Sequence, residues 1–171
     1  MKKSILVVMS LIVLSSCQQQ MKTGFVDNGK LINDYQKKKD IESKFKTKID
    51  AFNQKADSIG KAFQLEVQEF QSKANSMGQK AAQDKYQVLS QKKQIQDYQL
   101  KAQEQQIQNE GQAKIDTLIK EVRAFVKDYG QKNGYTYILG SNDAGSVMYG
   151  KEENDLTQLL LDELNKSYKK Q

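Results

Sequence analysis

The stretch "ANSMGQK", residues 74–80, decides the fold because it interrupts a helical pattern that extends far in both directions. Asn75 and Gly78 belong to a cluster of turn-forming residues that the flanking segments do not repeat. Before this cluster, apolar residues recur in steps of three or four from Ile41 to Met77, which is the spacing of one helix face. A disordered chain of similar polarity would not keep this spacing, so the pattern predicts a long helix.

A second helical pattern follows the turn, from residue 80 to residue 132. Apolar residues mark one face near both of its ends, at Ala82, Tyr86, Leu89, Ile115, Leu118, Val122, Phe125 and Tyr129. Gly134, just beyond it, suits the left-handed position that ends many helices. Two long helices joined by a tight turn predict an antiparallel coiled-coil hairpin over residues 30–133, with the turn near 75–79. Each helix would be about 75 Å long at the α-helical rise per residue.

The middle of the second helix, "QKKQIQDYQLKAQEQQIQNE" (91–110), has a thin apolar face, and eight of its residues are Gln. Steps of three and four from the flanking apolar face lead through Lys93, Gln96, Leu100, Gln103 and Ile107. Two interpretations remain open. The seam is either kept loose so that the hairpin can flex, or it reflects compositional drift in a solvated coiled coil.

The segments on either side of the hairpin predict a small body that contains β structure. "TGFV" (23–26) is expected to form a strand, followed by Asp27 as the N-cap of a helix that continues unbroken into the hairpin. "YTYIL" (135–139) and "SVMY" (146–149) read as strands on either side of a turn-rich segment. This arrangement predicts a β-hairpin.

A last amphipathic helix follows Asp155, which has the spacing of a capping box with Gln158. Residues 23–29 and 134–171 would therefore form a body of strand, β-hairpin and helix. The predicted fold class is mainly α with a small β body (α+β). A sheet this small leaves unpaired edges that a partner must cover, so we expect the body to be an oligomerisation unit.

The N-terminus has the features of a lipoprotein leader. "MKK" supplies positive charge, and the apolar run that follows is too short to span a bilayer. "LSSC" (14–17) then resembles a bacterial lipobox, in which the Cys is acylated and becomes the mature N-terminus. We therefore predict a signal peptide over 1–16, lipidation of Cys17 and a lipid-anchored tether over 17–22. The alternative is an ordinary signal peptide with a chance Cys.

The composition argues against catalysis. The chain has no His and only one Cys, which excludes zinc sites and His- or Cys-based chemistry. Gly145 to Lys151 fits the phosphate-loop spacing, but Glu152 stands where Ser or Thr would be needed, so no nucleotide or other cofactor is predicted. Both helical segments carry a small net positive charge with acids interspersed among the Lys residues. Together with an envelope address, this argues against nucleic acid as a partner.

Three stretches resemble the Skp/OmpH family of periplasmic chaperones: "GFVDNGKLINDY" (24–35), "NGYTYILGSNDAGSVMYG" (133–150) and "NDLTQLLLDELNK" (154–166). The resemblance covers essentially the whole mature chain, and the order of elements agrees with it. It implies a homotrimer joined through the small bodies. It also implies an ATP-independent holdase that encloses unfolded outer-membrane proteins between three helical tentacles. The expected location is the periplasm. The predicted lipid anchor departs from the freely soluble members and points to the periplasmic face of the outer membrane.

The resemblance also suggests which side chains contact clients. The candidates are Phe63, Phe70, Tyr86, Ile95, Tyr98, Leu100 and Ile107. For the four aromatic residues, packing in the seam between the helices is the preferred alternative. A different function also stays open, in which the chain is a structural coiled-coil lipoprotein that acts as an envelope spacer.

Overall fold

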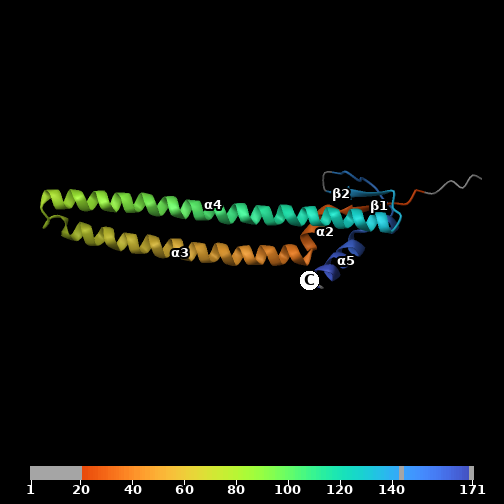
Figure 1. Ribbon diagram of the computed structural model, residues 1–171, viewed down its shortest axis with the longest axis horizontal. Coiled ribbons are helices and arrows are strands. Elements are labelled where there is room, and N and C mark those ends of the chain that lie inside the picture. The colour runs from red at the N-terminus through yellow and green to blue at the C-terminus, as the bar shows by residue number, and fades with distance from the viewer. Residues whose placement is uncertain (1–20, 143–144, 170–171) are drawn as a thin grey trace, which may run out of the picture.

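The computed structural model describes residues 21–142 and 145–169. Cys17, the predicted signal peptide and most of the tether lie outside the described residues. The elements are β1 (Thr23–Asp27), α2 (Asn28–Asp34), α3 (Gln36–Ala74), α4 (Gln79–Lys132), β2 (Tyr137–Ser141), the short 3-10 helix η1 (Glu152–Asn154) and α5 (Thr157–Lys169). They form a small body and one long projection (Figure 1).

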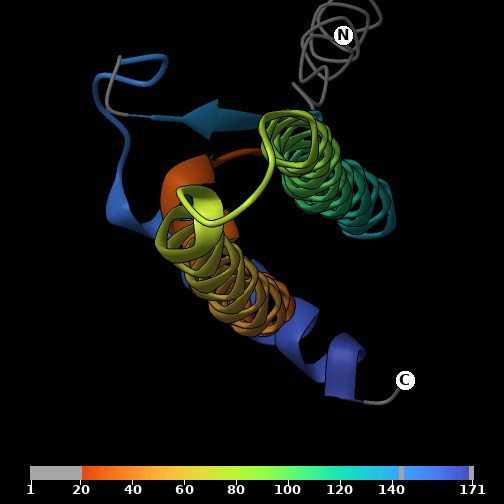
Figure 2. The ribbon, with the colours of Figure 1, turned by 90° about the vertical axis from the view of Figure 1, so that its left-hand side faces the viewer.

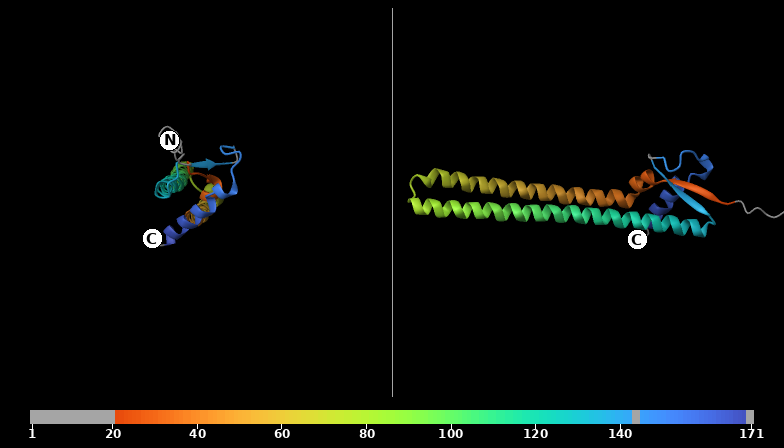
Figure 3. Two further views of the ribbon diagram at one scale, coloured as in Figure 1. Left: turned by 90° about the vertical axis from the view of Figure 1, so that its right-hand side faces the viewer. Right: turned by 90° about the horizontal axis from the view of Figure 1, so that it is seen from above.

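The projection is the predicted helical hairpin. Helices α3 and α4 lie side by side in opposite directions and are joined by the short turn after Ala74 (Figures 1 and 3). Helix α4 has 54 residues and is therefore about 80 Å long. Gly134 follows its C-terminus with a φ of 70°, as expected for a left-handed C′ residue. The fold class, mainly α with a small β body, is confirmed.

The helix predicted to run without a break from Asp27 into the hairpin is divided into two helices, α2 and α3. The chain leaves the helical conformation at Tyr35, whose ψ is 122°, so α2 ends at Asp34 and α3 begins at Gln36. Asp27 caps α2 as predicted, because its Oδ1 accepts the Lys30 backbone N–H at 2.9 Å. No Gly or Pro marks the break, so the continuous helix expected from the sequence was wrong for a reason that the local sequence does not contain.

The predicted β-hairpin is also wrong. Strand β2 pairs with β1 in parallel, from Thr23 opposite Tyr137 to Asp27 opposite Ser141, and the whole helical hairpin forms the crossover between them. Residues 146–149 form no strand. Val147 is half-buried, but Met148 is 89 % exposed and Tyr149 is 84 % exposed, so the two largest apolar side chains of this segment pack on none of the described residues. The alternating pattern of apolar and polar residues predicted a strand, but it could not show whether another part of the fold would cover the apolar side chains.

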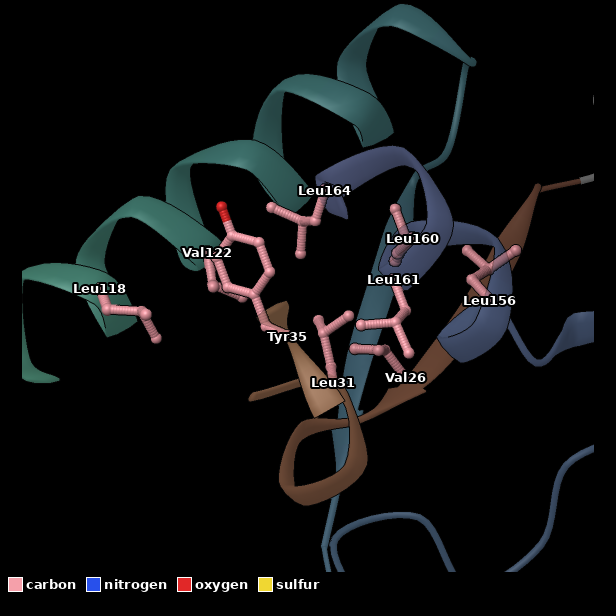
Figure 4. Close-up of a cluster of buried hydrophobic side chains, with 9 residues drawn as sticks. All are labelled: Val26, Leu31, Tyr35, Leu118, Val122, Leu156, Leu160, Leu161 and Leu164. Atoms are coloured by element: carbon pink, nitrogen blue, oxygen red, sulfur yellow. The ribbon is translucent and has the colours of Figure 1, made fainter. Parts of the chain in front are cut away.

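The core of the body lies where α2, α4 and α5 meet β1 (Figure 4). Its buried side chains are Val26, Leu31, Tyr35, Leu118, Val122, Leu156, Leu160, Leu161 and Leu164. A fully buried aliphatic side chain stabilises a fold by about 1.5–3 kcal/mol, so this cluster anchors the base of the hairpin. Because Leu118 and Val122 belong to α4, that helix runs unbroken from the core into the projection.

Helix α5 is tied to β1 at its start. The Asp27 backbone N–H donates to Thr157 Oγ1 at 2.9 Å, and the Leu156 N–H donates to the Phe25 carbonyl at 2.9 Å. Asp155 accepts the Thr157 N–H at 2.8 Å, but Gln158 donates to Asp162 instead of reaching back. The reciprocal capping box was therefore a wrong prediction, because the helix begins at Thr157 and Gln158 stands one position too early to close it.

Candidate functional site

Polar pairs connect the two helices of the hairpin from its base to near its tip. They are Lys37–Glu121, Lys48–Glu110, Lys55–Gln103 and Glu66–Lys92. From one pair to the next, α3 advances by the same number of residues as α4 goes back. These intervals are seven or eleven residues, so the paired side chains stay on one face of each helix. Exposed pairs of this kind add little stability, so their effect is to maintain one antiparallel register.

The apolar seam between the helices is thick at the base and thin in the middle. On α4 it contains the buried side chains of Leu89 and Ile107. Between these two, Gln96, Leu100 and Gln103 are only half-buried. The sequence pattern placed Lys93 in the seam, but its side chain is exposed. The neighbouring Lys92 is half-buried instead, and it pairs with Glu66 on the other helix. The Gln-rich stretch therefore does carry a weakly packed part of the seam.

A groove opens between the helices in the half of the hairpin near the turn. Its volume is about 310 Å³. It is lined by Phe63, Val67, Phe70, Gln71, Tyr86, Leu89, Ser90, Lys93 and Gln94. We call it the distal groove. Its floor is apolar, and its rim is formed by Gln, Ser and Lys side chains, which suits weak binding of an apolar chain with a polar backbone.

A second apolar surface lies on α4 outside the seam. Val88, Ile95 and Tyr98 are 55 %, 58 % and 76 % exposed, and the exposed Ala102 continues the series. Val88, Ile95 and Ala102 are seven residues apart and so share one face. Val88 precedes the buried Leu89 by one residue, so this face is turned by about 100° from the seam. We call these four residues the outer stripe.

The seven predicted client-facing residues are thus divided among three places. Phe63, Phe70 and Tyr86 line the distal groove. Ile95 and Tyr98 belong to the outer stripe, whereas Leu100 is half-buried and Ile107 is 5 % exposed in the seam. The sequence reasoning omitted Val88 and Ala102, although the spacing of seven residues with Ile95 would have identified them. It also omitted Val67 and Leu89 as groove residues.

Several titratable groups of the hairpin pair along its exposed surface. Over residues 21–142 and 145–169, no three His, Cys, Asp or Glu side chains gather closely enough to hold a metal ion. In the hairpin, the pKa of Lys61 is raised by its hydrogen bond and charge pairing with Asp57, and the pKa of Glu69 is lowered in the same way by Lys73. Both are exposed pairs along one helix, of the kind found on a solvated surface.

The described part of the chain contains no helix that is both long enough and apolar enough to cross a membrane. The hairpin is instead a thin polar projection that carries two apolar surfaces, the distal groove and the outer stripe. The family of OmpH-like outer membrane proteins matches residues 22–164, which include the body and the entire hairpin. The chain belongs to this family.

Solved structures agree with the OmpH-like fold. The crystal structure of a protein from Caulobacter crescentus CB15, described as an OmpH-like outer membrane chaperone, superposes with a TM-score of 0.77. The two sequences are 14 % identical, and the match covers 86 % of this chain and 85 % of the other. At this identity the likeness establishes the fold alone. A search of curated protein sequences gives no match.

Proposed function

We propose that this OmpH-like protein is an ATP-independent holdase chaperone that binds unfolded outer-membrane proteins along its helical hairpin and prevents their aggregation. The observation that carries the proposal is the apolar surface that the hairpin leaves exposed. A tightly closed two-helix spacer would bury its apolar residues in one seam. This hairpin instead presents the distal groove and the outer stripe to solvent.

The character of these surfaces supports transient binding. An exposed apolar patch rimmed by polar residues is typical of a site for another chain. Each surface contains only a few apolar side chains separated by Gln and Lys. A client would therefore be held by many weak contacts spread over a long projection, which allows release without an energy source.

The body supports assembly of several such hairpins. Tyr137 and Leu139 alternate with Ile138 on β2 and are 57 % and 51 % exposed, so they point away from the core. Among the described residues the sheet has only two strands, which leaves the outer edge of β2 unpaired. We propose that a homotrimer covers this face, as the family resemblance implies, so that three hairpins surround one client.

The proposed location rests on the leader predicted from the N-terminal sequence. We propose that Cys17 is acylated and holds the protein in the periplasm, on the outer membrane. Mass spectrometry of the mature protein checks this directly, since the N-terminal residue should be an acylated Cys17. A mature chain that begins at any other residue would remove the anchor from the proposal.

An aggregation assay tests the chaperone function. An unfolded outer-membrane β-barrel is diluted from denaturant with and without the protein, and light scattering is followed. The parent should suppress scattering, and a Val88→Gln, Ile95→Gln, Tyr98→Gln variant should suppress it several-fold less, because exposed apolar contact is lost while the seam is untouched. Leu65→Gln is the matched control, since Leu65 is 66 % exposed on α3 but lies outside both surfaces. Equal suppression by both variants would reject the outer stripe as the binding surface, and no suppression by the parent would reject the function.

A further inference from the structure

The break at Tyr35 requires an explanation that its own sequence does not give. The residues around it, "INDYQKKKD" (32–40), contain no Gly or Pro and can all adopt helical dihedral angles. Tyr35 cannot cap α3 with its side chain, and no such hydrogen bond is made. The bend must therefore be held by contacts from elsewhere in the fold.

Those contacts come from the C-terminal half of α5. The Gln36 backbone N–H, the first free donor of α3, donates to Asn165 Oδ1 at 3.0 Å. Asn165 thus performs the capping role from another helix, 129 residues away. In a continuous helix this N–H would bond to the carbonyl four residues earlier, so Asn165 substitutes for the bond that the break removes.

A second contact holds the next turn of α3. Tyr168 donates its hydroxyl hydrogen to Asp40 Oδ2 at 2.9 Å, while Gln36 Nε2 donates to Asp40 Oδ1 at 2.8 Å. The Tyr168 ring also meets the buried Tyr35 ring edge to face, with centroids 6.0 Å apart. Each carboxylate oxygen of Asp40 therefore accepts one hydrogen bond, the first from a residue of α3 and the second from a residue of α5.

Helix α5 spans the distance between the sheet and the base of α3. Its first turn is fixed to β1 through Thr157, and its middle is fixed to the core through Leu160 and Leu164. Its last turns then reach α3, and the view along the hairpin shows α5 crossing the base of α3 (Figure 2). Helix α4 continues without a break from the hairpin into the core. Of the two hairpin helices, only α3 is separated from the body by a break, at Tyr35.

We infer that Asn165 and Tyr168 form a latch that fixes the angle at which α3 leaves the body. Releasing the latch frees the base of α3 to tilt against α4, and the width of the client space changes with it. Asn165 and Tyr168 are thus positioning residues that do not contact the client. The effect on client size rests on the proposed function, whereas the effect on α3 does not.

Hydrogen exchange of the full-length protein tests the latch. An Asn165→Ala, Tyr168→Phe variant removes the two hydrogen bonds but keeps the aromatic contact with Tyr35. Amides of residues 37–45 should exchange about tenfold faster, as expected for loss of a helix cap and its neighbouring bond. Amides of β1 and of the hairpin near the turn should keep the parent's rates. Ser167→Ala, between the two latch residues and exposed, is the matched control.

A rescue variant separates the latch from a general loosening of the body. Proline suits the first position of a helix, and the residue before it prefers the extended conformation that Tyr35 already has. Gln36→Pro added to the double variant should therefore return the exchange of residues 37–45 toward the parent's rate. Parent-like exchange in the double variant would overturn the latch, and so would fast exchange that Gln36→Pro fails to reduce.

The functional consequence is read from two unfolded β-barrel clients of different size. Suppression of aggregation should shift in favour of the larger client in the double variant and return with Gln36→Pro. An unchanged ratio would overturn the role of the latch in client size. If the parent protects neither client, the proposed function fails, while the exchange rates still decide whether the latch exists.

Discussion

At the base of the hairpin, the carboxylate of Asp40 accepts two side-chain hydrogen bonds. Hydrogen bonds from Gln36 and then from Tyr168 lower its pKa, and the charge of Lys44 acts in the same direction. The same Asp40 contact raises the pKa of Tyr168. A carboxyl group with a lowered pKa stabilises the fold above its ordinary pKa, and this contribution is lost as the pH falls through the lowered value. The Tyr168–Asp40 hydrogen bond of the latch should therefore hold throughout the neutral range and weaken in acid, whereas the Asn165 hydrogen bond does not titrate.

Titration of the Asp40 carboxyl by NMR checks this assignment. In a Tyr168→Phe variant, the pKa of Asp40 should rise toward its ordinary value but remain below it, because the bond from Gln36 persists. Glu69, whose pKa is lowered by Lys73 far along the hairpin, is an internal control and should not change. An unaltered Asp40 pKa would show that the Tyr168 hydroxyl does not bond to it in solution.

Contacts of a single residue were predictable only where they are local in sequence. The Asp27 cap could be predicted because its partner is three residues away. The Asn165 cap could not, since nothing in the sequence places residue 165 beside residue 36. The sequence could have shown that Ile107 lies in the seam and Ile95 outside it. Ile107 falls on the same helix face as Leu89 and Leu100, whereas Ile95 does not.

The elements show the same division between local and distant causes. Helix periodicity and the turn at residues 75–78 are local, so the hairpin could be predicted from the sequence. Strand pairing is not local: the alternation in residues 146–149 carried no information about an absent partner, and the parallel pairing of β1 with β2 depends on the whole crossover. The Tyr35 break was missed because α5, whose Asn165 is 129 residues beyond Gln36 in the chain, holds it from outside.

At the scale of the hairpin, the thin part of the seam can be tested by filling it. Gln96→Leu with Gln103→Leu places apolar side chains at two half-buried seam positions and removes the exposed Lys55–Gln103 hydrogen bond, which adds little stability. The pair of changes should stabilise the hairpin by about 1–2 kcal/mol, less than full burial would give. The free energy of local opening that hydrogen exchange measures across residues 90–110 should rise by a similar amount. Gln99→Leu with Gln106→Leu, at exposed positions of the same helix, is the control and should slow nothing.

The functional readout of the filled seam decides between the two explanations for the Gln residues. If flexibility is required, the stiffer hairpin should protect large unfolded β-barrels less well than the parent does. If the stiffer variant protects all clients equally, drift in a solvated coiled coil is the better explanation. The control variant guards against a third effect, in which extra exposed Leu side chains simply bind clients more tightly.

For the whole molecule, the question is what joins the copies. The polar pairs that cross the hairpin are satisfied within one chain. The body exposes Tyr137 and Leu139 beside an edge of β2 that is unpaired among the described residues. Charges placed on that face would be buried without partners in an assembly, which is strongly unfavourable, but would cost little in an isolated chain. The body, and not the hairpin, should therefore determine the oligomeric state.

Sedimentation velocity of a Tyr137→Lys, Leu139→Lys variant tests this. We expect the parent to sediment as a trimer and the variant as a monomer with unchanged helix content by circular dichroism, because both side chains point away from the core. Leu65→Lys makes the same kind of change on the hairpin and should leave the trimer intact. A variant that stays trimeric would move the interface away from β2, and a monomeric parent would remove the enclosed cavity from the proposed mechanism. In that last case each hairpin would have to hold its client with the distal groove and outer stripe alone.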